Sequence, residues 1–107
     1  KRDIAVAYNK LGDALIAKGK TEEAVRNYRA GLAIRKELAA AAPGDTQLQW
    51  DLLVLQWRLA STGDEPAKRF SEIVAALRDL AAKRKLSVEQ ARWLPAAEQE
   101  LARAKSQ

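Results

Sequence analysis

The chain has 107 residues, with 19 Lys and Arg against 14 Asp and Glu, and it contains neither Cys nor His. These absences exclude disulfides and thiolate chemistry, and they remove the commonest metal ligands and acid–base catalysts. We therefore predict no enzyme activity, no metal and no cofactor. The sequence has no run of about 18 uncharged apolar residues, so no membrane-spanning segment is expected.

Apolar residues recur at helical spacing in the first half of the chain. A first helix should span about residues 3–18, and Gly19 should end it. Thr21 is a good N-cap for a second helix over about 22–41, which the turn at Pro43 should stop. The apolar face of the first helix is expected to contain Ile4, Ala7, Tyr8, Leu11 and Leu15.

Two further helices should follow this turn. The third, over about 46–61, is apolar nearly all round, which is typical of a helix buried between neighbours. Asp64 is the expected cap of the fourth helix, over about 65–83, and Pro66 suits its first turn. The inward face of the fourth helix should contain Phe70, Ile73, Val74, Leu77 and Leu80.

A fifth helix should begin after Ser87, which forms a capping-box pattern with Gln90. It should continue to about Ala104. Pro95 lies too deep in the pattern for an N-terminal proline, so it should kink or split the helix near Leu94. The residues expected to face inward are Val88, Ala91, Leu94, Ala97 and Leu101.

The first two helices carry a paired motif. The pattern Tyr8-x-x-Leu11-Gly12-x-x-Leu15 lies on the first helix, and Ala24-x-x-x-Tyr28 with Gly31 lies on the second. This spacing resembles the helical hairpin of tetratricopeptide (TPR) repeats. The resemblance is to the long-period repeats of bacterial multidomain proteins, and it rests on residues 2–13, 28–35 and 42–45, with residues 85–94 similar to the segment that often ends such arrays.

Part of the motif returns 48 residues later, where Asp3-Ile4 is matched by Asp51-Leu52 and Leu11-Gly12 by Leu59-Ala60. This offset exceeds the period of about 34 residues in the simple repeat. The second unit has lost the glycine of the motif and has a shorter turn. Such departures are typical of a terminal repeat.

The resemblance implies an all-α fold, in which antiparallel helical hairpins stack as a short right-handed TPR-like solenoid of about five helices. A single domain should cover 1–107, with a well-formed hairpin at 1–45, a degenerate second hairpin at 46–84 and a C-terminal capping helix at 86–105. The chain begins without a Met, inside a helical pattern. We therefore interpret it as the end of an array from a larger bacterial protein, located in the cytoplasm.

By the same resemblance, the first helix of each hairpin lines a concave groove. Asn9 would then supply hydrogen bonds to a peptide backbone, Lys10 or Arg58 would hold a carboxylate, and Trp57 would be an aromatic anchor. Two alternatives remain open: Trp57 packs against the first or fifth helix, and Lys10 and Arg58 are ordinary solvated charges. The groove positions are Val6, Asn9, Asp13 and Ile16 beside Lys10 in the first unit, and Val54, Trp57 and Ser61 beside Arg58 in the second.

Some family members clamp the C-terminal carboxylate of chaperone tails with Lys and Asn. Here Asn9 stands at the position of that Lys, and Asp13 at the position of that Asn. Because an acidic residue would repel a carboxylate, we do not predict this specificity.

The resemblance implies a non-catalytic scaffold that binds a peptide or a partner domain. One alternative is a structural or oligomerisation module that associates with itself through an exposed apolar edge of the first helix. Another is a basic nucleic-acid-binding domain, suggested by the net charge of +5 and by Lys83-Arg84-Lys85. The positive charges are spread over all the predicted helices, as on a solvated surface, so nucleic-acid binding is the less favoured alternative.

Overall fold

The computed structural model describes residues 2–106, and within that range it is all-helical and has no β-strand. Lys1 and Gln107, the two ends of the predicted domain, lie outside the described residues. The predicted all-α class is confirmed, and both ends of each of the first four helices lie within one residue of their predicted positions. The helices are α1 (Arg2–Ala17), α2 (Thr21–Ala41), α3 (Thr46–Ser61), α4 (Pro66–Ala82), α5 (Val88–Ala91) and α6 (Trp93–Lys105).

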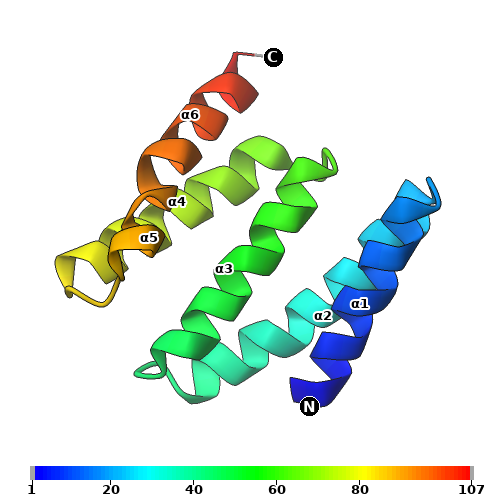
Figure 1. The fold of residues 1–107 in the computed structure, drawn as a ribbon, viewed down its shortest axis with the longest axis horizontal. Helices are drawn as coiled ribbons and strands as arrows, with labels where there is room; N and C mark the ends of the chain where they lie inside the picture. Colours follow the sequence, from blue (N-terminus) through cyan, green and yellow to red (C-terminus); the bar gives the residue numbers. More distant parts are fainter. Residues whose placement is uncertain (1, 107) are drawn as a thin grey trace.

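Each long helix packs against its neighbour in sequence (Figure 1). α1 and α2 form one hairpin, α3 packs between α2 and α4, and α6 returns along α4. Short turns force consecutive helices to run in nearly opposite directions. The resulting row of helices is compatible with a small solenoid of the helical-repeat type.

α3 is apolar on opposite faces because it belongs to two hydrophobic clusters. Leu55 and Leu59 pack towards α2, whereas Leu53 and Ala60 pack towards α4 and α6. The prediction that the third helix is buried between neighbours is thus confirmed. The N-terminal cluster contains Ala24, Tyr28, Leu32, Leu55 and Leu59; the C-terminal cluster contains Leu53, Ala60, Phe70, Ile73, Val74, Leu77 and Ala97.

α1 approaches α2 closely through small residues. Ala5 is fully buried, and Gly12 lies against the ring of Tyr28. A Cβ atom at Gly12 would lie 2.5 Å from Cε1 of Tyr28, which is closer than real Cβ contacts allow. The glycine of the motif is therefore needed for this helix pair to reach its observed separation.

The predicted inward face of α1 is only partly right. Tyr8 and Leu15 are half-buried, but Ile4 and Leu11 are 52% and 50% exposed. They lie at the edge of α1 that turns away from α2. The periodicity of a helix identifies its apolar side, but it does not show whether a neighbour covers the whole of that side.

The turn before α4 is held by ion pairs and not by the predicted side-chain cap. Glu65 is the N-cap residue and has a left-handed backbone with φ of 47°. Asp64, the predicted cap, instead accepts hydrogen bonds from Arg29 of α2 and Arg69 of α4. We call Arg29, Asp64 and Arg69 the Asp64 cluster.

The predicted cap of α2, Thr21, is not the N-cap residue either. Lys20 holds that position and makes no side-chain capping bond.

The predicted fifth helix is split into α5 and α6, as Pro95 led us to expect. The capping box is confirmed: Gln90 N donates to Ser87 Oγ and Ser87 N donates to Gln90 Oε1, each at 3.0 Å. The break falls at Arg92, so Pro95 lies in the first turn of α6, where its missing N–H is tolerated. Ala97 is fully buried, but Val88 and Ala91 are exposed, which contradicts their predicted inward orientation.

Candidate functional site: a polar pocket between α1, α2 and α3

Three of the predicted groove residues, Asn9 on α1 and Val54 and Arg58 on α3, line the same open pocket, which has a volume of about 320 Å³. The remaining lining comes from α2 and from other positions on α3. We call it the α1–α3 pocket. Its lining residues are Asn9, Arg35, Gln47, Trp50, Asp51, Val54 and Arg58.

Arg35 is the most unusual residue of this pocket. It is a charged residue on the buried side of α2 and is only 7% exposed. Its Nη1 lies 3.5 Å from Asp51 Oδ2, and its buried Nε has no hydrogen-bond partner. Burial lowers the pKa of the Arg35 guanidinium; Asp51 opposes this effect, while Arg2 and Arg58 add to it. A guanidinium that is both buried and incompletely bonded raises the free energy of the folded state.

Asn9 also has a buried side-chain atom without a hydrogen-bond partner, but this atom is an acceptor and not a donor. Its Oδ1 atom is buried without a hydrogen-bond partner and lies next to α2, since a Cβ atom at Gly31 would be 3.1 Å from it. Within residues 2–106, Asn9 Oδ1 and Arg35 Nε are the buried side-chain polar atoms that lack a partner. Both residues line the α1–α3 pocket, so an unpaired acceptor and an unpaired donor occur at one site.

Asp51 is the acidic residue among the basic residues of the pocket. Its carboxylate accepts hydrogen bonds from Gln47 Nε2 at 2.7 Å and from Arg2 Nη2 at 3.4 Å. The second cation near this carboxylate, after Arg2, is Arg35. The charged lining therefore comprises two guanidiniums, Arg35 and Arg58, and one carboxylate, so that the lining carries one excess positive charge.

Asp13 is placed beside the pocket and not in its lining. Its carboxylate accepts a hydrogen bond from the Tyr28 hydroxyl and lies 3.8 Å from Arg58 Nη1. Burial and this hydrogen bond raise the pKa of Tyr28 to about 12. Asp13 thus links α1 to both α2 and α3, and part of its charge is compensated by Arg58.

Trp57 packs within the protein. Its ring makes edge-on contacts with Phe70 at 5.2 Å and with Trp93 at 5.1 Å, measured between ring centroids. Trp57 is half-buried against the C-terminal cluster. Its contact with Trp93, which belongs to the predicted fifth helix, agrees with the alternative that Trp57 is a packing residue. Trp57 is not among the residues that line the pocket. The aromatic residue in the pocket lining is Trp50, whose ring lies 4.8 Å from that of Trp93.

The other predicted groove residues lie outside the pocket. Lys10 and Ile16 are exposed on α1, with Ile16 39% exposed, and Val6 is 36% exposed on the same helix. Ser61 is exposed at the end of α3. The structure thus brings together Asn9, Val54 and Arg58 in the pocket, and Asp13 through its ion pair.

Four lining residues were not predicted from the sequence: Arg35, Gln47, Trp50 and Asp51. A signal for Arg35 was nevertheless present. Ala24, Tyr28, Gly31 and Arg35 recur at intervals of three and four residues, so they share one face of α2. A charged residue on an otherwise apolar or small-residue face marks a buried polar site.

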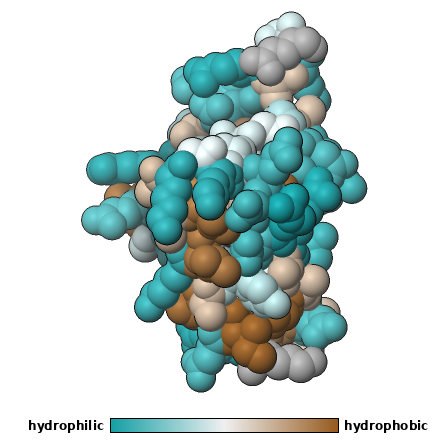
Figure 2. All heavy atoms as spheres, turned by 90° about the vertical axis from the view of Figure 1, so that its right-hand side faces the viewer, coloured by the Kyte–Doolittle hydropathy of each residue, from teal (hydrophilic) through white to brown (hydrophobic). Residues whose placement is uncertain are grey.

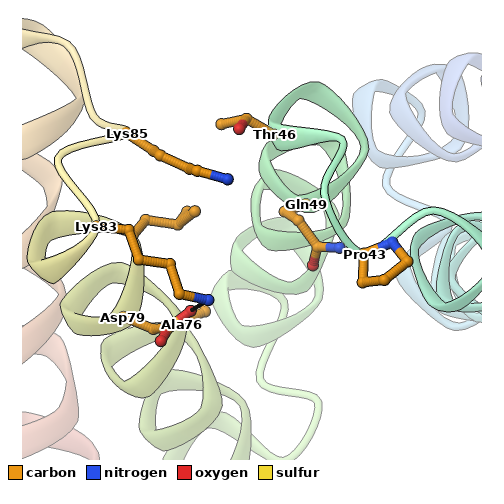
Figure 3. A pocket seen from close by; sticks show the side chains of 8 residues that line it. Pro43, Thr46, Gln49, Ala76, Asp79, Lys83 and Lys85 are labelled. Carbon is orange, nitrogen blue, oxygen red and sulfur yellow. Dashed lines mark ion pairs between the residues drawn. The ribbon is translucent and has the colours of Figure 1, made fainter.

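A second hollow, of about 250 Å³, lies between the N-terminus of α3 and the C-terminus of α4 (Figure 3). Lys83 forms an ion pair with Asp79 at 3.0 Å, and Lys85 extends across the opening towards Thr46 (Figure 3). The lysines are exposed, and no buried polar atom without a partner lines this hollow in the described chain. It is therefore the weaker of the two candidate sites.

No group of three or more His, Cys, Asp or Glu side chains within residues 2–106 could hold a metal ion. None of the helices in the described part of the chain is both long and apolar enough to cross a membrane. No protein-family model matches the chain, and the comparisons with curated proteins and with solved structures found no match. The resemblance to TPR repeats therefore rests on the motif residues alone.

Proposed function

We propose that this chain is a non-catalytic interaction module of the TPR type, which binds a peptide or a partner domain across α1 and α3. The observation that carries the proposal is the α1–α3 pocket, where Asn9 and Arg35 keep unpaired polar atoms. Buried polar groups normally have partners, and exceptions in a native protein call for an explanation. A peptide backbone offers both donors and acceptors, so it suits a pocket that presents both.

The groove can be tested with peptides selected from a randomised display library on the immobilised chain. For peptides selected in this way, we expect Asn9→Ala and Arg58→Gln each to weaken binding by about tenfold, because each removes one polar contact. Affinity is measured by fluorescence anisotropy of the labelled peptides. Arg78→Gln is the matched control, since Arg78 is an exposed arginine on α4 that pairs with Glu98.

Unchanged affinity in both pocket variants would remove the α1–α3 face from the binding site. A loss of similar size in Arg78→Gln would instead indicate attraction by net charge. Trp57 is a poor test residue, because its replacement would disturb the packing against Phe70 and Trp93.

A second candidate function is self-association through α1. Ile4 and Leu11 are half-exposed and lie seven residues apart, on the side of α1 away from Asn9 and Asp13. Figure 2 shows hydrophobic surface gathered in the lower half and middle of the side of the molecule that carries α1. Exposed apolar patches of this kind are common at protein interfaces.

If this edge mediates self-association, the double variant Ile4→Lys, Leu11→Lys should be monomeric under conditions in which the unmodified chain forms oligomers. Sedimentation equilibrium over a range of chain concentrations measures the difference. Val88→Lys is the control, because Val88 is 78% exposed but lies on α5. Oligomers that persist in the double variant would exclude the α1 edge, and oligomers that disappear in Val88→Lys would point to α5.

A protein partner suits the charge distribution better than nucleic acid. Several of the basic residues have acidic partners: Arg29 and Arg69 share Asp64, and Arg78 pairs with Glu98. Nucleic-acid binding needs a surface of uncompensated Lys and Arg. Cytoplasmic location, the absence of catalysis and the absence of nucleic-acid binding remain predictions.

A further inference from the structure

We propose that two copies of this chain form a dimer by exchanging α6, and that the connection between α4 and α5 is the hinge. In the structure, α6 folds back along the α4 of its own chain (Figure 1). In the exchanged dimer, each α6 lies on the α4 of the other copy and makes the same contacts there. The inference concerns α4, α5 and α6, and it goes beyond the proposed peptide binding on α1 and α3.

The hinge differs in composition from the other turns. The turns after α1, α2 and α3 contain Gly19, Gly44 and Gly63, whereas the connection between α4 and α5, residues 83–87, contains neither Gly nor Pro. It reads Lys-Arg-Lys-Leu-Ser, and Lys, Arg and Leu are strong helix formers. The whole of residues 67–94 also lacks Gly and Pro. The sequence is therefore compatible with one continuous helix from α4 through α5.

The backbone of the hinge adopts a conformation that favours glycine. Arg84 N donates to Ala81 O at 3.0 Å and Lys85 N donates to Leu80 O at 2.9 Å, which is the pattern that ends a helix with a left-handed residue. That left-handed residue is Arg84, with φ of 56°. A side chain disfavours this conformation, because its Cβ atom comes too close to the backbone. Straightening the hinge into a helix relieves this strain.

Few interactions hold the hinge in its bent form. Within residues 2–106, Glu65 is the other non-glycine residue with a positive φ, but the Asp64 cluster fixes its turn. Arg84 is exposed and has no side-chain partner in the described chain. α5 contains no buried residue. The bent form is stabilised by the capping box at Ser87 and by Leu86, which packs against the C-terminal cluster.

The contacts between α4 and α6 are kept in the exchanged dimer. Ala97 of α6 is fully buried in the C-terminal cluster with Ile73 and Leu77 of α4. Arg78 of α4 donates to Glu98 of α6 at 2.8 Å. Because these contacts re-form between copies, the exchange keeps the packing on α4 and relieves the strain of two hinges. The two-fold arrangement is closed, so association stops at the dimer. Association costs translational freedom, so the dimer should form as the chain concentration rises.

The test detects the exchange by cross-linking α4 of one copy to α6 of another. The chain contains no Cys, so an introduced cysteine is unique. Chains carrying Arg78→Cys and chains carrying Glu98→Cys are mixed, refolded together from urea at high concentration and treated with a short bismaleimide. We expect a dimer in sedimentation velocity and, by mass spectrometry of that dimer, a product that joins positions 78 and 98 of different chains. An oligomer formed through the α1 edge leaves each α6 on its own chain and does not give this product.

Two substitutions in the hinge should change the affinity of the dimer in opposite directions. Arg84→Gly relieves the strain of the bent turn and weakens the straight helix, and each dimer has two hinges. It should therefore weaken dimerisation by about a hundredfold. Ser87→Ala removes the capping box and favours the helix, so it should strengthen dimerisation by about tenfold. Arg84→Lys is the matched control, because it keeps both the strain and the charge. Sedimentation equilibrium measures the dissociation constants.

Three results would overturn the inference: chains that stay monomeric after refolding at every concentration, a dimer without the product between positions 78 and 98, or an Arg84→Gly variant that dimerises as tightly as the unmodified chain. A hundredfold loss in Arg84→Lys would also contradict it, since backbone strain is then not the cause. Arg84 and Ser87 are exposed, so both hinge variants should keep the circular dichroism of the folded chain. None of these results bears on the proposed peptide binding, whose variants lie on α1 and α3.

Discussion

Replacing Asp64 by alanine is expected to lower the free energy of unfolding by about 3–5 kcal/mol. The reason is the state of Arg69 after the change. Arg69 is 8% exposed, and its Nε and Nη2 donate to Asp64 Oδ2 at 3.0 and 2.6 Å. Without Asp64, a nearly buried guanidinium would lose its main counter-charge. Urea denaturation followed by tryptophan fluorescence and circular dichroism measures the change.

The other arginine of the Asp64 cluster supplies the control. The Arg29 side chain is 54% exposed, so Arg29→Ala removes a solvent-screened ion pair and should cost less than about 1 kcal/mol. If Asp64→Ala also lowers the free energy of unfolding by less than about 1 kcal/mol, Arg69 must find solvent or another partner in that variant. Glu65 is the nearest candidate, since its carboxylate lies 3.7 Å from Arg69 Nη2.

The Asp64 cluster should also make stability depend on pH in the acidic range. Burial acts to raise the pKa of Asp64, but the hydrogen bonds from Arg29 and Arg69 prevail and hold it below the ordinary value of an aspartate. The stabilisation is complete above the unfolded-state pKa of about 3.9 and is lost as the pH falls through the lower folded-state pKa. The stability difference between the unmodified chain and Asp64→Asn should therefore narrow as the pH falls below about 3.9.

The helices could be predicted from the sequence because their signals are local. Hydrophobic periodicity, the turns at Gly19 and Pro43 and the capping box at Ser87 all act within a few residues. The role of Asp64 could not be predicted in the same way. Its partner Arg29 lies 35 residues earlier in the chain, and a local rule assigns an aspartate before a helix to the cap. Tertiary ion pairs override such a preference.

The candidate site was predicted in part, and the omissions have a physical cause. The resemblance indicates residues on α1 and α3, and Asn9 and Arg58 are among those that lie on the pocket lining. Trp50 and Trp57 lie seven residues apart on one face of α3, so sequence alone does not show which of them reaches the pocket. Arg35 is not among the groove residues that the resemblance indicates. Its burial depends on how closely α1 and α3 approach that helix.

Replacing Gly12 by alanine is expected to destabilise the chain by about 1–3 kcal/mol, although alanine is the better helix former. The added Cβ would lie 2.5 Å from Tyr28 Cε1. Tyr28 is 3% exposed and its hydroxyl donates to Asp13, so the ring has no room to turn aside without losing that bond. The measurement is urea denaturation, with Gly44→Ala as the control because a Cβ at Gly44 would meet no atom within 4 Å.

Two further measurements separate this clash from a general loss of stability. In a Tyr28→Ala background the obstacle is gone, so Gly12→Ala should become neutral or stabilising. In a Tyr8→Phe background, which leaves Tyr28 as the single tyrosine, the phenol pKa should fall from about 12 towards 10 when Gly12→Ala displaces the ring. If Gly12→Ala lowers the free energy of unfolding equally with and without Tyr28, the close approach of α1 and α2 is contradicted.

Ala60, at the corresponding position of the second hairpin, is buried at 4% exposure in the C-terminal cluster. A methyl group is therefore accommodated in the second hairpin, and the requirement for glycine belongs to the Gly12–Tyr28 contact of the first.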